Sequence, residues 1–237
     1  SENRIAVVSH DRLDVLASPN GEIVTEAEYL EPVIFLDDTI DGWYHVELPL
    51  QRGYTGYLPF DRIFFLSGAP YEKLVVVDVP TVLASGAPDS GLPIRNLRGG
   101  TILPVISTSE RYYLVDLEEG PGWISRDSVL DLTFTSQLPS ANEVISNARR
   151  MLGQDYVWGG ATWGSTDCSG FVNIVFRISG LLLKRDCGIQ YDDLTGKEIG
   201  LSEALPGDLV YISTYLDTPS HVGIISHNNM IIHCCSR

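Results

Sequence analysis

Alternating apolar and polar positions, separated by turn-forming residues, dominate residues 1–130 of the chain. The clearest runs lie at 43–48, 53–59, 111–117 and 120–124. Asp41-Gly42 precedes the first run, and a turn followed by alternation is typical of a hairpin strand. The last two runs repeat the order of the first two more weakly. We therefore predict two similar all-β units built from short strands, residues 1–68 and 69–132.

A helical pattern replaces the alternation after a polar linker. Ser140 followed by Glu143 has the spacing of a capping box, in which each residue satisfies backbone N–H groups at a helix start. Apolar residues then recur every four positions, at Val144, Ala148 and Leu152. Gly153 suits the end of the helix. This pattern predicts a helix over 141–152, which opens a third unit at 133–237.

The remainder of the third unit alternates between a second helix and several strands. The apolar face of the helix consists of Phe171, Val172, Val175, Phe176 and Ile178. Ser169 lies near its start and Gly180 marks its end, which places Cys168 at the helix N-terminus. Apolar runs at 208–212, 221–225 and 230–233 predict three strands. The sequence thus favours a multidomain chain, with two β units followed by an α+β domain.

Composition narrows the possible partners of the chain. The net charge is −15, and the acidic residues are spread along the sequence. Nucleic acids and anionic membranes require clustered Lys and Arg, so neither is an expected partner. The acidic character suits a substrate that carries a free amine, although solubility alone also explains it. The longest apolar runs, such as 178–183, are too short to cross a bilayer, and we predict no transmembrane segment.

Four cysteines are present, at positions 168, 187, 234 and 235. Four in a chain of this length do not make a disulfide scaffold. No C-x-x-C pair occurs, and the spacing of Cys187, His233, Cys234 and Cys235 matches no usual zinc pattern. We therefore predict no metal and no other cofactor. An isolated cysteine is usually a small buried hydrophobe. We interpret Cys187, Cys234 and Cys235 in this way.

Cys168 is different because of its predicted position and because of two histidines downstream. Unpaired N–H groups and the positive end of the helix dipole favour a thiolate at a helix N-terminus. His221 and His233 fall on neighbouring predicted strands, where two side chains can lie side by side. A nucleophile, a base and a group that orients the base are the parts of covalent catalysis. The pattern predicts a cysteine nucleophile with a histidine base and a second histidine that orients it.

Five motifs in the third unit occur in the order found in one known family. They are Tyr156-Val-Trp-Gly-Gly160, Asp167-Cys-Ser-Gly-Phe171, Pro206-Gly-Asp-Leu-Val-Tyr211, His221-Val-Gly-Ile-Ile225 and Ile231-Ile-His233. Residues 141–237 thereby resemble the NlpC-type cysteine peptidase domain, a papain-like α+β fold. The resemblance implies that Cys168 is the nucleophile, His221 its base and His233 the third polar residue. It also implies that Tyr156 helps to hold the oxyanion.

The resemblance implies further site residues and shows some departures. Asp167, Ser169, Trp158 and Ser220 are the implied substrate-binding residues. Arg185 and Gln190 resemble a family segment that we interpret as structural. Asp155 stands where the family usually has proline. Family members continue with further strands after the third histidine, so we expect either a shorter sheet here or residues beyond Arg237.

The two β units resemble bacterial SH3-like barrels, whose strands carry similar glycine and aromatic patterns. Their tyrosines, Tyr54 among them, line either a ligand groove or the barrel core. Together the resemblances imply a peptidoglycan hydrolase that cuts the γ-D-glutamyl–diamino acid bond of cell-wall stem peptides. A related thiol amidase or acyltransferase and a non-catalytic wall-binding protein are the alternatives. We expect a monomer that acts outside the cytoplasm, although the chain opens at Ser1 without a signal-peptide pattern.

Overall fold

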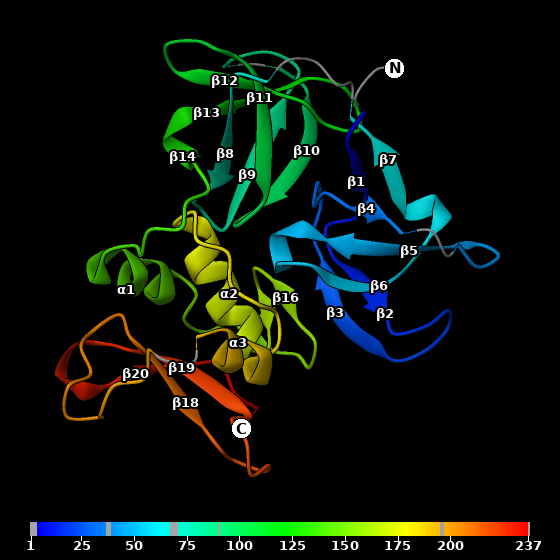
Figure 1. Ribbon diagram of the computed structural model, residues 1–237. Helices are drawn as coiled ribbons and strands as arrows, with labels where there is room; N and C mark the ends of the chain where they lie inside the picture. Colours follow the sequence, from blue (N-terminus) through cyan, green and yellow to red (C-terminus); the bar gives the residue numbers. More distant parts are fainter. Residues whose placement is uncertain (1–3, 37–38, 67–70, 90, 195–196, 237) are drawn as a thin grey trace. The chain divides into compact units, whose positions relative to one another are not determined.

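The computed structural model describes residues 4–36, 39–66, 71–89, 91–194 and 197–236 (Figure 1). Two compact units make up the chain. The first comprises residues 1–49 with 55–133, and the second comprises 50–54 with 134–237. None of the described helices is long and apolar enough to span a membrane.

The N-terminal part of the first unit contains seven short strands. They are β1 (Ala6–Val8), β2 (Leu13–Leu16), β3 (Ile23–Ala27), β4 (Ile34–Phe35), β5 (Trp43–Leu48), β6 (Tyr54–Pro59) and β7 (Ile63–Phe65). Five of them form a sheet in the order β3-β2-β6-β5-β4, and β1 pairs with β7. Val15, Val46 and Leu58 are fully buried in the core between them. The strands predicted at 43–48 and 53–59 are confirmed as β5 and β6.

Seven more strands follow in the same unit. They are β8 (Lys73–Val77), β9 (Thr81–Ser85), β10 (Pro93–Arg98), β11 (Ile102–Thr108), β12 (Tyr112–Val115), β13 (Gly122–Ser125) and β14 (Val129–Leu132). Their sheet has the order β10-β9-β13-β12-β11-β8-β14. The strands predicted from the weaker repeat are confirmed as β12 and β13. Both sets of strands are compatible with SH3-like domains, and the predicted boundary at 68/69 lies outside the described residues.

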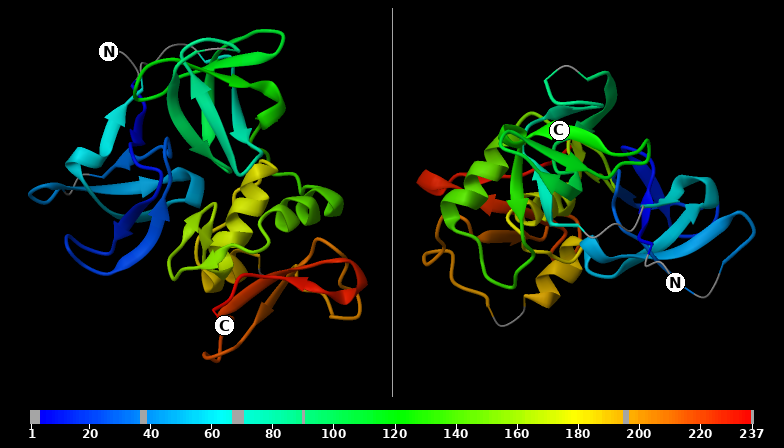
Figure 2. Two further views of the ribbon diagram at one scale, coloured as in Figure 1. Left: turned by 180° about the vertical axis from the view of Figure 1, so that it is seen from behind. Right: turned by 90° about the horizontal axis from the view of Figure 1, so that it is seen from above.

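Within its described residues, the second unit combines three α-helices with two small sheets. The helices are α1 (Ala141–Arg150), α2 (Cys168–Ile178) and α3 (Cys187–Asp193). One sheet has the order β18-β19-β20, from Leu209–Ile212, His221–Ile225 and Ile231–Ile232. The other has the order β15-β17-β16, from Asp155–Tyr156, Ser165–Thr166 and Ala161–Thr162. Helix α2 packs against α1, β16 and β19, which places it at the centre of this unit (Figure 1 and Figure 2).

The predicted helices are confirmed, with small differences at their ends. Ser140 caps α1 by accepting a hydrogen bond from the Glu143 backbone N–H at 3.3 Å. The helix ends at Arg150, two residues before the predicted end. Helix α2 is buried along its whole length and ends at Ile178, just before Gly180. Gly180 has a φ of 81°, a conformation that favours glycine after a helix. Helix α3 was not predicted.

Candidate active site

Cys168 is the first residue of α2, and the turn that presents it is tightly built. Asp167 caps the helix, and its Oδ1 accepts a hydrogen bond from the Gly170 N–H at 2.7 Å. A Cβ atom on Gly170 would lie 2.0 Å from the carbonyl oxygen of Gly160, so only glycine fits there. The Asp-Cys-Ser-Gly sequence is therefore a helix start that packs directly on the preceding loop. Cys168 itself is 8% exposed.

His221 and His233 come together as the strand pattern predicted. His221 begins β19, and His233 follows β20, which pairs with β19 through Ile224 and Ile232. The His221 Nε2 atom lies 2.9 Å from the His233 Nδ1 atom, and the two rings are nearly perpendicular. Burial lowers the pKa of His221, and the electrostatic interaction with the neighbouring His233 ring lowers it further. His221 is thus neutral at pH 7, as a general base must be.

Helix α2, which begins with Cys168, packs on β19, which begins with His221. A hydrogen bond from the Val222 backbone reaches the Cys168 thiol, and Val222 directly follows His221 in the strand. The expectation of a resting thiolate is wrong, however. Burial raises the pKa of Cys168, and the Asp167 carboxylate raises it further, whereas the Val222 and Ser169 backbone groups and Arg185 lower it less. Burial outweighs the helix N-terminus, so the Cys168 thiol keeps its proton at neutral pH.

Tyr156, the residue expected to hold the oxyanion, lies beside the thiol. It belongs to β15 and is half-buried. Burial, followed by the charges of Asp167 and Cys168, raises the pKa of Tyr156 to about 12. The phenol therefore keeps its proton at neutral pH and can donate a hydrogen bond to a developing negative charge.

The four residues expected to bind substrate have different surroundings. Trp158 is 68% exposed. The Ser220 Oγ atom accepts a hydrogen bond from the Thr214 N–H at 3.0 Å and so holds the turn before β19. Asp167 and Ser169 are buried and both contact Arg185. Contacts of these four side chains with a substrate stay predictions.

Two polar contacts near the site were not predicted from the sequence. Arg185 is 1% exposed and lies within 3.1 Å of the Asp167 carboxylate. The Tyr54 hydroxyl donates a hydrogen bond to Asp186 Oδ2 at 3.1 Å. For Arg185, the sequence signal was the resemblance of the Arg185–Gln190 segment to a family motif. Tyr54 was named among the tyrosines that line either a ligand groove or the barrel core, but its partner Asp186, 132 positions away, could not be chosen from the sequence.

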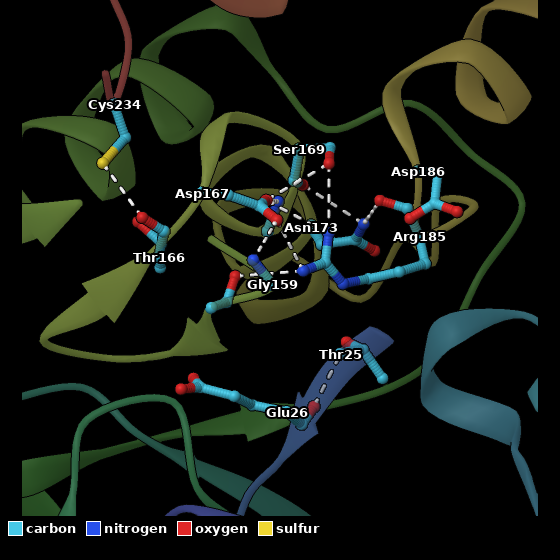
Figure 3. Close-up of polar contacts among 12 residues, drawn as sticks. Thr25, Glu26, Gly159, Thr166, Asp167, Ser169, Asn173, Arg185, Asp186 and Cys234 are labelled. Atoms are coloured by element: carbon cyan, nitrogen blue, oxygen red, sulfur yellow. Dashed lines mark hydrogen bonds and ion pairs between the residues drawn. The ribbon is translucent and has the colours of Figure 1, made fainter. Parts of the chain in front are cut away.

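Two further cysteines lie near the site. Burial raises the pKa of Cys187 to about 12, and the charge of Cys168 is the next largest cause. The Cys234 thiol donates a hydrogen bond to the Thr166 carbonyl at 3.3 Å (Figure 3). Across the described part of the chain, no three His, Cys, Asp or Glu side chains are grouped so that they could hold a metal ion.

Comparisons with known proteins place the C-terminal part of the chain in a known context. The sequence profile of the NlpC/P60 family matches residues 153–237. A probable endopeptidase p60 of Listeria seeligeri is 42% identical over 90 residues, 38% of this chain and 17% of that protein. A γ-D-glutamyl-L-lysine dipeptidyl-peptidase of Bacillus subtilis (strain 168) is 27% identical over 199 residues, 81% of this chain and 65% of that protein. The chain therefore spans less than two thirds of the length of either relative.

Solved structures extend the likeness to the β units. The crystal structure of an NlpC/P60 family protein from Bacillus cereus ATCC 10987 matches 97% of this chain and 90% of its own, with a TM-score of 0.81. At 19% identity, this match shows the fold. The profile match, the relatives and the shared fold together confirm the resemblance found in the sequence. Residues 153–237 form a domain of the NlpC/P60 family.

Proposed function

We propose that this protein is a peptidoglycan hydrolase that cleaves the γ-D-glutamyl–diamino acid bond of cell-wall stem peptides. The observation that carries the proposal is the contact of His221 with His233 beside a cysteine that begins a buried helix. Relatives named as cell-wall endopeptidases and as a γ-D-glutamyl-L-lysine dipeptidyl-peptidase support the substrate class. Because this substrate is part of the cell wall, the enzyme acts outside the cytoplasm.

The reaction starts with proton transfer from Cys168 to His221. The His221 Nε2 atom is engaged by His233, which leaves Nδ1 to accept the thiol proton. The resulting thiolate attacks the γ-carbonyl carbon of the glutamyl residue, and the carbonyl oxygen becomes an oxyanion. Backbone N–H groups at the start of α2 and the Tyr156 hydroxyl stabilise that charge.

The second half of the reaction returns the enzyme to its starting state. His221 donates the proton from Nδ1 to the leaving amine of the diamino acid, and a thioester remains on Cys168. Water then attacks the thioester while His221 accepts its proton. The thiol is restored when the glutamyl product leaves. His233 accepts a hydrogen bond from the His221 Nε2–H throughout and so fixes the tautomer of the base.

A free amine on the substrate would be recognised by Asp186 and Tyr54. Asp186 precedes α3 and is half-buried, and burial raises its pKa. Tyr54 donates to it, and burial raises the pKa of Tyr54 to about 12, so the phenol keeps its proton. A half-buried carboxylate is stabilised by an ammonium partner. The terminal amine of an L-Ala-γ-D-Glu peptide would supply one.

Asp186→Asn is expected to raise KM for L-Ala-γ-D-Glu-diaminopimelate by roughly tenfold, because a charge-assisted hydrogen bond contributes about 1.5 kcal/mol or more. The kcat should change little, since Asp186 takes no part in proton transfer. Asp193→Asn, at the other end of the same helix, is the matched control because Asp193 pairs with Arg52 instead. N-acetylation of the substrate alanine should abolish the difference between wild type and Asp186→Asn. Equal loss in both variants would refute amine recognition by Asp186.

A further inference from the structure

Arg185 is the most deeply buried charged side chain near the nucleophile, and it contacts residues on both sides of Cys168. Its Nη1 atom lies 3.1 Å from Asp167 Oδ1 and 3.0 Å from Ser169 Oγ. Its Nη2 atom lies 2.8 Å from Asp167 Oδ2 and 3.2 Å from the Gly160 carbonyl oxygen. Figure 3 shows the guanidinium pointing at this group from the segment that precedes α3. The planar fork matches the carboxylate, a geometry that lysine cannot reproduce.

The Asp167 carboxylate joins three parts of the second unit. It caps α2 through the Gly170 N–H, and its Oδ2 accepts a hydrogen bond from the Gly159 N–H at 3.2 Å. Arg185 supplies the third connection. A buried ion pair holds only while both partners are present, because either charge alone is costly to bury. The direction in which the first turn of α2 presents Cys168 therefore depends on Arg185.

A second set of hydrogen bonds ties the same two segments together. The Asn173 Nδ2 atom donates to the Ser169 carbonyl at 3.2 Å and to the Lys184 carbonyl at 2.9 Å. The Gln190 Nε2 atom donates to the Ser169 carbonyl at 3.4 Å. These bonds involve no charge. They keep the segment before α3 beside α2, so the fold does not rest on Arg185 alone.

We propose that Arg185 is a positioning residue for the nucleophile: by holding Asp167 and Ser169 it fixes the orientation of Cys168 and sets the charge around the thiol. The inference rests on the proposed function only in taking Cys168 as the nucleophile. The two members of the Asp167–Arg185 ion pair have opposite effects on the pKa of the thiol. The Asp167 carboxylate raises the pKa of Cys168, and the Arg185 guanidinium lowers it.

Other groups also act on this thiol and stay constant in the test. The backbone of Val222 in β19 contacts the thiol, and the side chains of Tyr156, Cys187 and Tyr215 interact with it electrostatically. Burial is the largest cause of the raised pKa of Cys168. A substitution that merely loosened the site would admit water, and it would lower the pKa whichever partner was replaced.

The test measures the rate at which iodoacetamide alkylates Cys168 as a function of pH, by mass spectrometry of the peptide that contains it. Arg185→Gln should raise the apparent pKa of Cys168 by about one unit. At pH values below that pKa, the rate of alkylation should then be about tenfold lower than in wild type. Asp167→Asn should lower the apparent pKa by a similar amount, and asparagine still caps the helix. The double variant should return towards wild type. Arg95→Gln, which removes a partly buried arginine fork elsewhere in the chain, should leave the profile unchanged.

Arg185→Lys separates position from charge. It keeps the positive charge but loses the fork, so the apparent pKa should stay near wild type while kcat on a stem peptide falls at an unchanged KM. Shifts in the same direction for Arg185→Gln and Asp167→Asn, or no shift in either, would overturn the proposal. If Arg185→Gln does not fold, the proposal is tested with Arg185→Lys, Asp167→Asn and the double variant. Their alkylation profiles are then compared with one another. Opposite shifts in a chain that hydrolyses no stem peptide would refute the proposed function and leave this inference standing.

Discussion

Cys168→Ala is expected to abolish hydrolysis of a stem peptide, with a loss of more than about a thousandfold in kcat/KM. Alanine has no sulfur atom and cannot form the thioester. The fold should survive, because the substitution removes one sulfur atom from a helix whose cap and apolar face are unchanged. Circular dichroism and thermal unfolding of the variant check this, and rate assays on the same preparation measure the loss.

The other cysteines provide the controls for that result. Cys235→Ala removes an exposed thiol and should leave the rate unchanged. Cys187→Ala removes a buried thiol close to the site, so it controls for changes in packing. A loss in Cys187→Ala as complete as that in Cys168→Ala would contradict the assignment of the nucleophile.

His221→Ala is expected to lower kcat by about a hundredfold to ten-thousandfold, the usual contribution of general acid–base catalysis. His233→Gln should cost less, roughly tenfold, because glutamine can still accept a hydrogen bond from the base. His227→Ala, in the exposed turn between β19 and β20, is the matched control and should retain full activity. If His233→Gln were as inactive as His221→Ala, His233 would do more than orient the base.

The pH dependence of the same variants tests the electrostatics of the pair. The acid limb of the wild-type rate profile should lie at lower pH than an ordinary histidine would give, because only neutral His221 accepts a proton and its pKa is lowered. His233 lowers that pKa. His233→Gln removes this influence, so the acid limb of the profile should move to higher pH. A limb that moved to lower pH would contradict the contact between the two rings.

The elements that present Cys168 and the histidines could be predicted because their signals are local. The Asp-Cys-Ser-Gly run is a helix cap, and the two histidines lie on strands joined by a short turn. Helix α3 could not be predicted in the same way. It has seven residues, and the Asp186 side chain makes no capping hydrogen bond, so neither periodicity nor a start signal marks it.

The contacts around Cys168 could not be predicted from the sequence, because they join residues that are far apart along the chain. Arg185 pairs with a carboxylate 18 residues earlier, and nothing in the spacing selects Asp167 from the other acidic residues. The protonation of Cys168 was predicted wrongly for a related reason. A helix N-terminus is visible in a sequence, whereas burial, which here has the larger effect on the pKa, emerges only when α2 packs on β19.

The most direct test of the central claim is mass spectrometry of the products from L-Ala-γ-D-Glu-diaminopimelate, with the full chain and with Cys168→Ala. The account predicts that the full chain releases free diaminopimelate and L-Ala-γ-D-Glu, and that Cys168→Ala leaves the peptide intact. Cleavage at the L-Ala–D-Glu bond would indicate a different thiol amidase. An intact peptide with the full chain, together with retained binding to peptidoglycan, would indicate a wall-binding protein and contradict the account.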